Sequence, residues 1–378
     1  MEPTATFSEY SVKTPMAKPR ILVSYFFGPR TIPLGEFCAQ GFEAAGCEVF
    51  RFSSQLSHPL EDYGFKWLGK LARGLRLPDT YFREGHPWNN ARYRERCLEA
   101  AIARFRPDIL FVIRGNSVSG EFLKRMKRQY AVRHTLGWWV KDPRPNDTQL
   151  TDDCRLYDHY FCIHRHGYTQ ADPIHYLPAL GLEQRPARPP ATAPKDEKAL
   201  GIVLVGGWSR RRDAYVRELL DLPLTIVGPG WKKRGRLEPV HWHHVAASQL
   251  WGDEVAALYR RARIVLNVSS WDPAALTGLN LRICDVPALG AFLLTDEAAE
   301  LADFVEPGRE VATFTTPADL RAKALYYLEH SDEREAIARA GLLRAATTMP
   351  TYTDKMAEIL NFLGERPNTA ASKTWANA

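Results

Sequence analysis

The stretch that decides the fold is GIVLVGGWSRRRDAYVRELLDLPLTIVGPG, residues 201–230. Its first five residues form a short apolar, β-branched run that predicts a buried strand, and two glycines follow directly. A helix is predicted for 212–220, and residues 224–227 predict a second strand that again ends at glycines. A buried strand, a glycine turn, a helix and another buried strand are typical of a parallel α/β sheet.

The same alternation extends in both directions along the chain. Further strands are predicted at 21–27, 47–52, 109–113, 134–140, 159–164, 264–268, 291–294 and 311–314. Helices are predicted between them at 34–45, 90–105, 120–129, 254–261, 281–289, 319–328 and 332–346.

A proline-rich segment, QRPARPPATAPKDEK at 184–198, predicts a solvated linker between two such series. The 378 residues also suit two domains, at about 150 residues per domain. We therefore predict an α/β protein with two Rossmann-like, doubly wound parallel-sheet domains, residues 19–183 and 199–350, that face a central cleft. The remaining divisions are a flexible leader at 1–18, a C-terminal helix at 351–365 and a tail at 366–378.

Composition and charge narrow the class of protein. With 45% apolar and 25% charged residues, the chain is neither disordered nor fibrous. A net charge of +6 suits a phosphate-bearing ligand without demanding nucleic acid. Six cysteines without a CxxC pair predict reduced thiols and a cytoplasmic location. No signal sequence or spanning segment is recognisable, although peripheral contact with a membrane surface stays open.

Three segments follow strands at the place where an open parallel sheet binds ligands. In the first, the turn at Gly206, Gly207 and Trp208 leads into arginines at a helix start, where Arg212 can hold a diphosphate. The alternative is a solvated basic loop. No dinucleotide or P-loop fingerprint is present, which disfavours NAD and ATP modules.

The second segment contains Gly230, Trp231 and Lys232. Its tryptophan can stack on a nucleobase and its lysine can support phosphate charge, whereas the alternative is an ordinary Pro-Gly turn.

The third segment contains Asn280, Arg282 and Asp285. Here the Asp285 carboxylate can accept both hydroxyls of a ribose while Arg282 faces the leaving phosphate. An acid near a helix start is also favourable for the helix dipole alone.

The second half then resembles a family. The motifs VGGWSRRR, IVGPGW, LNVSSWDPAALTGLNLRICDVPALGAFLLTD, FVEPGREVATF and DLRAKALYYLEHSDEREAIARAG, in this order between about 201 and 363, are similar to the CgeB-type, glycosyltransferase-family-1-like proteins. In the first half, RPDILFVIRGNSVS, GWWVKDPRPND, LYDHYF and HYLPAL resemble the same proteins. The resemblance implies a GT-B fold that binds a nucleotide sugar in its C-terminal domain.

The resemblance also assigns residues. It implies that Arg212 is the arginine after the glycine turn, that Trp231 is the tryptophan of a YGxxW-like motif, and that Arg282 and Asp285 belong to an RxFE-like segment. The chain departs from that pattern at Asp285, where Glu is usual, and at Cys284, where Phe is usual. A second Glu of the wider retaining enzymes, eight positions earlier, is replaced by Thr277.

The predicted reaction moves a sugar from a nucleoside-diphosphate donor in the C-terminal domain to an acceptor at the N-terminal domain. The departing charge needs stabilisation, and without a metal or cofactor Arg212, Lys232 and Arg282 are the candidates. The acceptor base is sought at first-domain strand ends, where Asp142, His164 and His166 are candidates. The acceptor side is further predicted to include Gly28, Arg114 and Asn116. Histidine-rich stretches at 159–166 and 241–244 lack a second half-site, so no metal site is predicted.

A basic segment at 65–76 has two interpretations. Phe65, Leu68, Leu71 and Leu75 share one helical face, with four cations and no acid. Such a helix can pack on the first domain, or it can lie on an anionic membrane or guide an acidic acceptor.

Three other functions stay open at this point. The acceptor can be a base of nucleic acid, which the net charge and the basic segment would suit. The fold can also serve a nucleotide-sugar epimerase or a non-catalytic assembly protein. The acceptor itself is not identified by the sequence.

Overall fold

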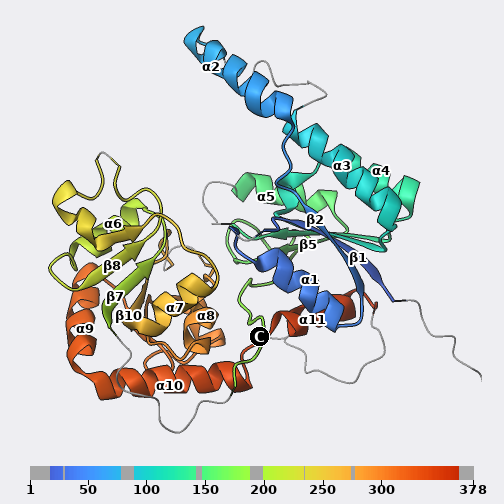
Figure 1. The fold of residues 1–378 in the computed structure, drawn as a ribbon. Helices are drawn as coiled ribbons and strands as arrows, with labels where there is room; N and C mark the ends of the chain where they lie inside the picture. The colour runs from blue at the N-terminus through green and yellow to red at the C-terminus, as the bar shows by residue number, and fades with distance from the viewer. Residues whose placement is uncertain are drawn as a thin grey trace, which may run out of the picture.

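The computed structural model describes residues 18–28, 30–77, 89–141, 147–187, 199–233, 235–273 and 277–365. This part of the chain forms two domains, each built on a six-stranded parallel sheet with helices packed on both faces (Figure 1). The predicted α/β fold class is confirmed.

The first domain has strand order β2-β1-β3-β4-β5-β6. Its central strand β3 is buried at all five positions, which explains its uninterrupted apolar sequence. The order reverses between β1 and β3, so their carboxyl ends form a topological switch point. The strands are β1 (Arg20–Tyr25), β2 (Glu48–Ser53), β3 (Ile109–Ile113), β4 (His134–Trp139), β5 (His159–Cys162) and β6 (Ile174–Tyr176), and the α-helices are α1 (Leu34–Ala44), α2 (Lys66–Gly74), α3 (Asn90–Phe105), α4 (Gly120–Tyr130) and α5 (Asp147–Asp153).

The second domain repeats this plan with strand order β12-β11-β10-β7-β8-β9. Its switch point lies between β7 and β10. The strands are β7 (Leu200–Val205), β8 (Leu224–Val227), β9 (Val245–Ala247), β10 (Ala262–Asn267), β11 (Leu293–Asp296) and β12 (Ala312–Phe314). The helices of this domain are α6 (Arg210–Arg217), α7 (Asp253–Arg261), α8 (Arg282–Ala288), α9 (Pro317–Glu329) and α10 (Ser331–Thr347), and the last helix of the described chain is α11 (Tyr352–Phe362).

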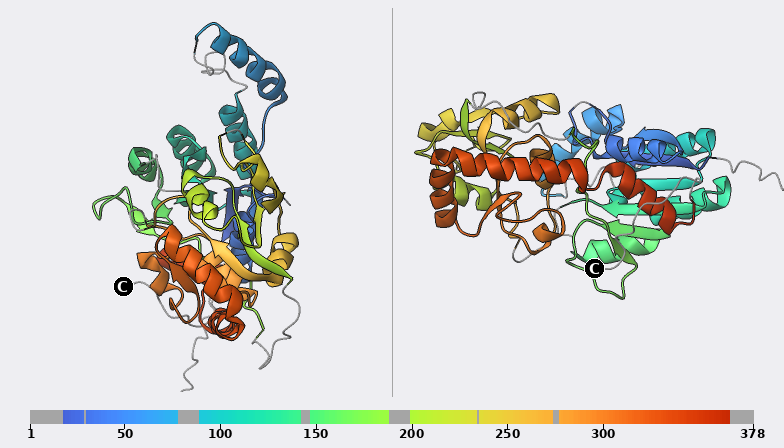
Figure 2. Two further views of the ribbon diagram at one scale, coloured as in Figure 1. Left: turned by 90° about the vertical axis from the view of Figure 1, so that its left-hand side faces the viewer. Right: turned by 90° about the horizontal axis from the view of Figure 1, so that it is seen from below.

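The chain crosses between the two cores twice, at adjacent places. Ala179 packs in the first core and Leu180 in the second, so the first crossing precedes the proline-rich segment predicted as the boundary. The return crossing lies between Met349 and Tyr352, after α10 has run beneath the second domain (Figure 2, right). The amide of Leu182 donates to Pro350 and that of Tyr352 donates to Leu182, each at 2.9 Å. Two paired segments therefore connect the domains.

The C-terminal helix α11 belongs to the first domain by its packing. Its residues Tyr352, Met356 and Ile359 are buried in the core that also contains α1 and the face of β1. The first domain is therefore completed by the last helix of the described chain (Figure 1).

The carboxyl ends of the two sheets face each other at the domain junction. The amide of Arg165, just after β5, donates to Oγ1 of Thr277 at 2.7 Å, in the loop between β10 and α8. Leu281 from the same loop packs against the first core. Loops that follow strands of the first sheet and loops that follow strands of the second sheet thus meet at the domain junction.

Candidate functional site

Two glycine turns meet at the carboxyl end of the second sheet. The amide of Gly206 donates to Val227 at 2.7 Å, and that of Trp208 donates to Pro229 at 2.9 Å. A Cβ at position 228 would lie 2.1 Å from the carbonyl oxygen of Gly206, so only glycine fits there. The two turns after β7 and β8 therefore brace each other.

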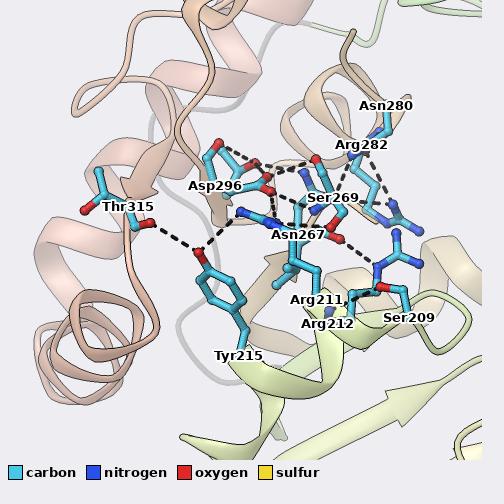
Figure 3. Close-up of polar contacts among 12 residues, drawn as sticks. Ser209, Arg211, Arg212, Tyr215, Asn267, Ser269, Asn280, Arg282, Asp296 and Thr315 are labelled. Carbon is cyan, nitrogen blue, oxygen red and sulfur yellow. Dashed lines mark hydrogen bonds and ion pairs between the residues drawn. The ribbon is translucent and has the colours of Figure 1, made fainter. Parts of the chain in front are cut away.

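Arg212 joins the two strands of the switch point. Ser209 caps α6 by accepting from the Arg212 amide at 3.2 Å, which sets the arginine in the first turn. The Arg212 Nε donates to the carbonyl of Val268, after β10, at 2.7 Å, and Nη1 donates to Gly207 at 2.9 Å (Figure 3). The predicted donor arginine therefore lies at the switch point, where it also ties backbone together.

Arg282 approaches the same point from α8. Its Nη2 donates to the carbonyl of Val205 at the end of β7, and its Nε donates to the Tyr259 hydroxyl at 3.2 Å. Its Nη1 lies 3.4 Å from the side-chain oxygens of Asn267 and Asn280 (Figure 3). Within the described part of the chain, all these hydrogen-bond acceptors are neutral.

Asn280 belongs to this network through a second bond. Its Nδ2 donates to Oδ1 of Asn267 at 2.9 Å, and Asn267 in turn donates to Thr295 at 2.8 Å. Asn267 is buried at the end of β10, so the chain of amides fixes the loop before α8.

One charged pair at this site has no counterpart among the predicted residues. Arg211 donates to Asp296 at 2.7 Å, and Asp296 also accepts from the amide of Ser269 at 2.8 Å. Of the consecutive arginines in the first turn of α6, Arg211 is thus neutralised internally. The sequence signal was an Asp that ends the buried strand β11, which is two strands away in the sheet from β7, the strand that precedes Arg211.

Trp231 is fully buried in the second core, where its Nε1 donates to the Gly206 carbonyl at 2.9 Å. The interpretation of Trp231 as a base-stacking residue is therefore wrong in this structure, because neither ring face is accessible. Trp208 is partly exposed, and the Arg236 guanidinium already lies over its ring at 4.0 Å. Gly230 accepts from Arg236 at 2.7 Å, while Lys232 extends to solvent.

Asp285 lies on α8 at the junction with the first domain. Solvent reaches its side chain, yet the surrounding protein raises its pKa to about 7, with Arg282 opposing the shift. Desolvation by this protein environment disfavours the charged form of the carboxyl.

The first domain contributes Tyr352 near this carboxyl, and Lys355 lies near the neighbouring Cys284. Lys355 is buried and donates to the Pro178 carbonyl at 3.0 Å, and burial lowers its pKa. Burial raises the pKa of Tyr352, and the charge of Asp285 adds a smaller contribution in the same direction. Asp285 therefore sits where the second domain meets α11.

Arg114 occupies the switch point of the first sheet. It follows β3 in a left-handed conformation, and its guanidinium lies over the ring of Phe26, after β1, at 5.0 Å. Gly28 follows shortly after Phe26 in the sequence and has a φ of +145°, and a Cβ at this position would meet no atom within 4 Å. The side chain of Asn116 and all of Asp142 lie outside the described residues, so their predicted roles stay predictions.

His164 is buried at the junction, with only 1% of its surface exposed. A Cβ on Gly278 would lie 3.1 Å from the Cβ of His164, and the Nδ1 of His164 lies 3.3 Å from the amide of His166. The role predicted for His164 as an acceptor base is therefore wrong for this structure, because an acceptor cannot reach its ring. His164 instead packs the first domain against the loop before α8.

No group of three His, Cys, Asp or Glu side chains that could hold a metal ion occurs in the described ranges. In the histidine-rich stretch at 241–244, both ring nitrogens of His244 are bonded to backbone carbonyls, those of Leu224 and Leu220, at 3.0 and 2.9 Å. The described part of the chain also has no helix that is long and apolar enough to cross a membrane.

Sequence comparison adds two matches. A family described as glycosyl transferase-like matches residues 210–361, which include α6, β10 and α8. The spore protein CgeB of Bacillus subtilis (strain 168) is 23% identical over 270 residues, which cover 67% of this chain and 81% of that protein.

Structure comparison extends over both domains. Sucrose-phosphate synthase from Thermosynechococcus elongatus aligns with a TM-score of 0.62 at 14% identity, over 92% of this chain and 99% of that one. HepE from Anabaena in complex with UDP-glucose aligns with a TM-score of 0.57 at 12% identity, over 91% of this chain and 99% of that one. At this identity the likeness shows a shared fold, the two-domain GT-B arrangement.

Proposed function

We propose that this chain, a CgeB-type protein of the GT-B glycosyltransferase class, transfers a sugar from a nucleoside-diphosphate donor bound at the second-domain switch point to an acceptor bound at the first. The geometry of the switch point supports the donor site, because strand order alone directs ligands to the carboxyl ends of β7 and β10. That a structural neighbour binds UDP-glucose supports the class of donor.

The observation that carries the proposal is the charge of Arg282. Its guanidinium is held at the end of β7 by hydrogen-bond acceptors that are all neutral within the described residues, so these bonds do not neutralise the cation, whereas Asp285 on the same helix interacts with it electrostatically. A positive charge fixed in advance at a strand end stabilises a departing diphosphate without reorganisation. Arg211 on α6 does not supply such a charge, because Asp296 neutralises it.

The remaining donor contacts follow from position. The two braced turns bring the backbone of Gly206 and Gly207 close to the same point, where a side chain would obstruct a phosphate. Lys232 extends to solvent from the second turn and can meet the distal phosphate. In this proposal Asp285, on the same helix as Arg282, accepts the ribose hydroxyls. Arg212 contributes by holding Gly207 and Val268 in register.

The proposal includes no metal. Arg282 and Lys232 then supply the charge stabilisation that a divalent ion would otherwise give. Addition of EDTA should leave turnover unchanged, and loss of activity that magnesium or manganese restores would contradict this part.

The test of donor binding is calorimetric titration of UDP, GDP and dTDP into the wild type and the Arg282→Gln variant. Glutamine keeps a donor near Val205 but removes the charge, so affinity should fall by about tenfold or more. Arg217→Gln is the matched control, because Arg217 forms a surface pair with Asp213 on the outer part of α6. Turnover is then tested with the nucleotide sugar that carries the same base as the nucleotide found to bind. The measured product is the released nucleoside diphosphate. Absence of binding by all three nucleotides would overturn the proposal.

A further inference from the structure

The helical arm at residues 60–77 stands apart from both cores. A π-helical turn at Leu60–Phe65 continues directly into α2, and the rod projects away from the body of the first domain (Figure 1 and Figure 2, left). Within α2 only Gly69 and Ala72 are buried, and no residue of the arm belongs to the four apolar cores of the described chain. The arm is therefore presented to the surroundings.

One face of this arm is apolar and exposed. Tyr63, Trp67, Leu71 and Leu75 follow each other at intervals of four, which places them along one side of a helix. Their exposed fractions are 85%, 63%, 46% and 61%. The exposed face differs from the predicted one, because Phe65 and Leu68 are partly buried. Large aromatic and aliphatic side chains in one exposed row mark an interaction site.

From Tyr63 onward the charge of the arm has one sign, since its two acids, Glu61 and Asp62, lie in the first turn. Between Tyr63 and Leu77 the chain has four cations, at 66, 70, 73 and 76, and no acidic residue. Lys70 and Arg76 are exposed beside the apolar row, while Lys66 pairs with Asp62 one turn earlier. An apolar row flanked by cations is complementary to a surface with anionic groups outside and hydrocarbon beneath.

We propose that this arm docks the protein on the surface of an anionic lipid bilayer. The apolar row would enter the boundary between headgroups and acyl chains, and Lys70 and Arg76 would meet the lipid phosphates. A nucleic acid would account for the cations but leave the leucines in water. A second copy of the same arm would bring like charges together, which disfavours a dimer through this face.

This inference is independent of the transferase activity, since no residue of the arm belongs to the donor site. Its test is flotation of the whole protein with vesicles of phosphatidylcholine alone or with about one third phosphatidylglycerol. The wild type should float with the anionic vesicles only, and high salt should weaken this binding.

Two pairs of substitutions separate the contributions of the arm. Trp67→Ser with Leu71→Ser should reduce the partition coefficient at least about tenfold, by removing buried apolar area. Lys70→Gln with Arg76→Gln should reduce it about 25-fold, at about fivefold per cation. All four sites are exposed, so the thermal transition by circular dichroism should stay unchanged.

The matched controls lie on other exposed surfaces. Lys124→Gln with Arg128→Gln on α4 and Val240→Ser with Leu325→Ser in the second domain should bind vesicles as the wild type does. Failure of the wild type to float, or equal loss in the control pairs, would overturn the proposal. Retardation of a DNA duplex, or a dimer that Trp67→Ser dissolves, without vesicle binding would overturn it in favour of another partner.

Discussion

Arg211 on α6 lies 2.7 Å from Asp296 at the end of β11, and both side chains are shielded from water. Asp296 also accepts from the amide and the hydroxyl of Ser269, so the pair fixes the loop after β10 as well. A buried ion pair of this kind contributes most visibly when one partner is removed, because the other charge is then left unpaired.

The Arg211→Ala variant should therefore lose about 3–5 kcal/mol of the free energy of unfolding. The Arg217→Ala variant, on the same helix, removes an exposed pair with Asp213 and should lose at most about 1 kcal/mol. Urea unfolding of both variants measures the difference. Equal losses of the free energy of unfolding would mean that removal of Arg211 does not leave an uncompensated buried charge on Asp296.

The contact between the first and the last helix gives a second prediction. Gly41 lies on α1 where α11 packs, and a Cβ there would lie 2.7 Å from the carbonyl oxygen of Tyr352. Gly41→Ala should consequently destabilise the protein by about 1–3 kcal/mol, because α11 must shift. Gly74→Ala at the end of α2 meets no atom within 4 Å and should be neutral or slightly stabilising. Thermal unfolding of the pair tests whether α11 is part of the first domain in solution.

Strand and helix positions were largely readable from the sequence, because each buried parallel strand is a short apolar run between turns. The run at 109–113 matches β3 at both ends. The short strands β6 and β9 and the helix α5 were missed. β6 has no fully buried residue and β9 has one, so neither carries the apolar signature.

The domain boundary was harder to place from composition. Proline marks solvated chain, whereas the crossing between the cores is made by Leu180 and Leu182, which are buried apolar residues. The local sequence around these leucines does not differ from the sequence at the end of a buried strand. The pairing of Leu182 with Thr351, far apart in the sequence, marks the crossing between the cores.

The candidate site shows the same limit. Position after a strand correctly located Arg212 and Arg282 at the switch point, because strand order decides which loops meet. It did not reveal that the Trp231 side chain is buried in the second core. An aromatic residue after a glycine turn can pack into the core or face a ligand, and the local sequence is the same in both cases. Burial is a tertiary property that the local pattern leaves open.

Asp285 gives a prediction on donor affinity. Its pKa of about 7 means that the carboxylate form, which accepts hydrogen bonds from ribose, becomes dominant only above neutrality. Affinity for the nucleotide that binds should therefore rise about tenfold between about pH 6 and pH 8. The Asp285→Asn variant should bind more weakly at about pH 8 and retain only the pH dependence that comes from the ligand's own phosphate. An unchanged profile in this variant would exclude Asp285 from the donor contacts.

The Asp285 carboxylate should lower the free energy of unfolding at the same pH values at which it favours binding of the donor. A folded-state pKa above the unfolded value of 3.8 means that the folded protein binds more protons, so this group's contribution to stability falls as pH rises from about 4 to 7. Asp285→Asn removes the desolvated charge and should raise the melting temperature at about pH 8, with a gain that shrinks toward about pH 4. Glu254→Gln on α7, an exposed acid, is the matched control and should show no such trend. A variant that is less stable than the wild type at about pH 8 would show that Asp285 is fixed by favourable contacts instead of being held in a desolvated position for a ligand.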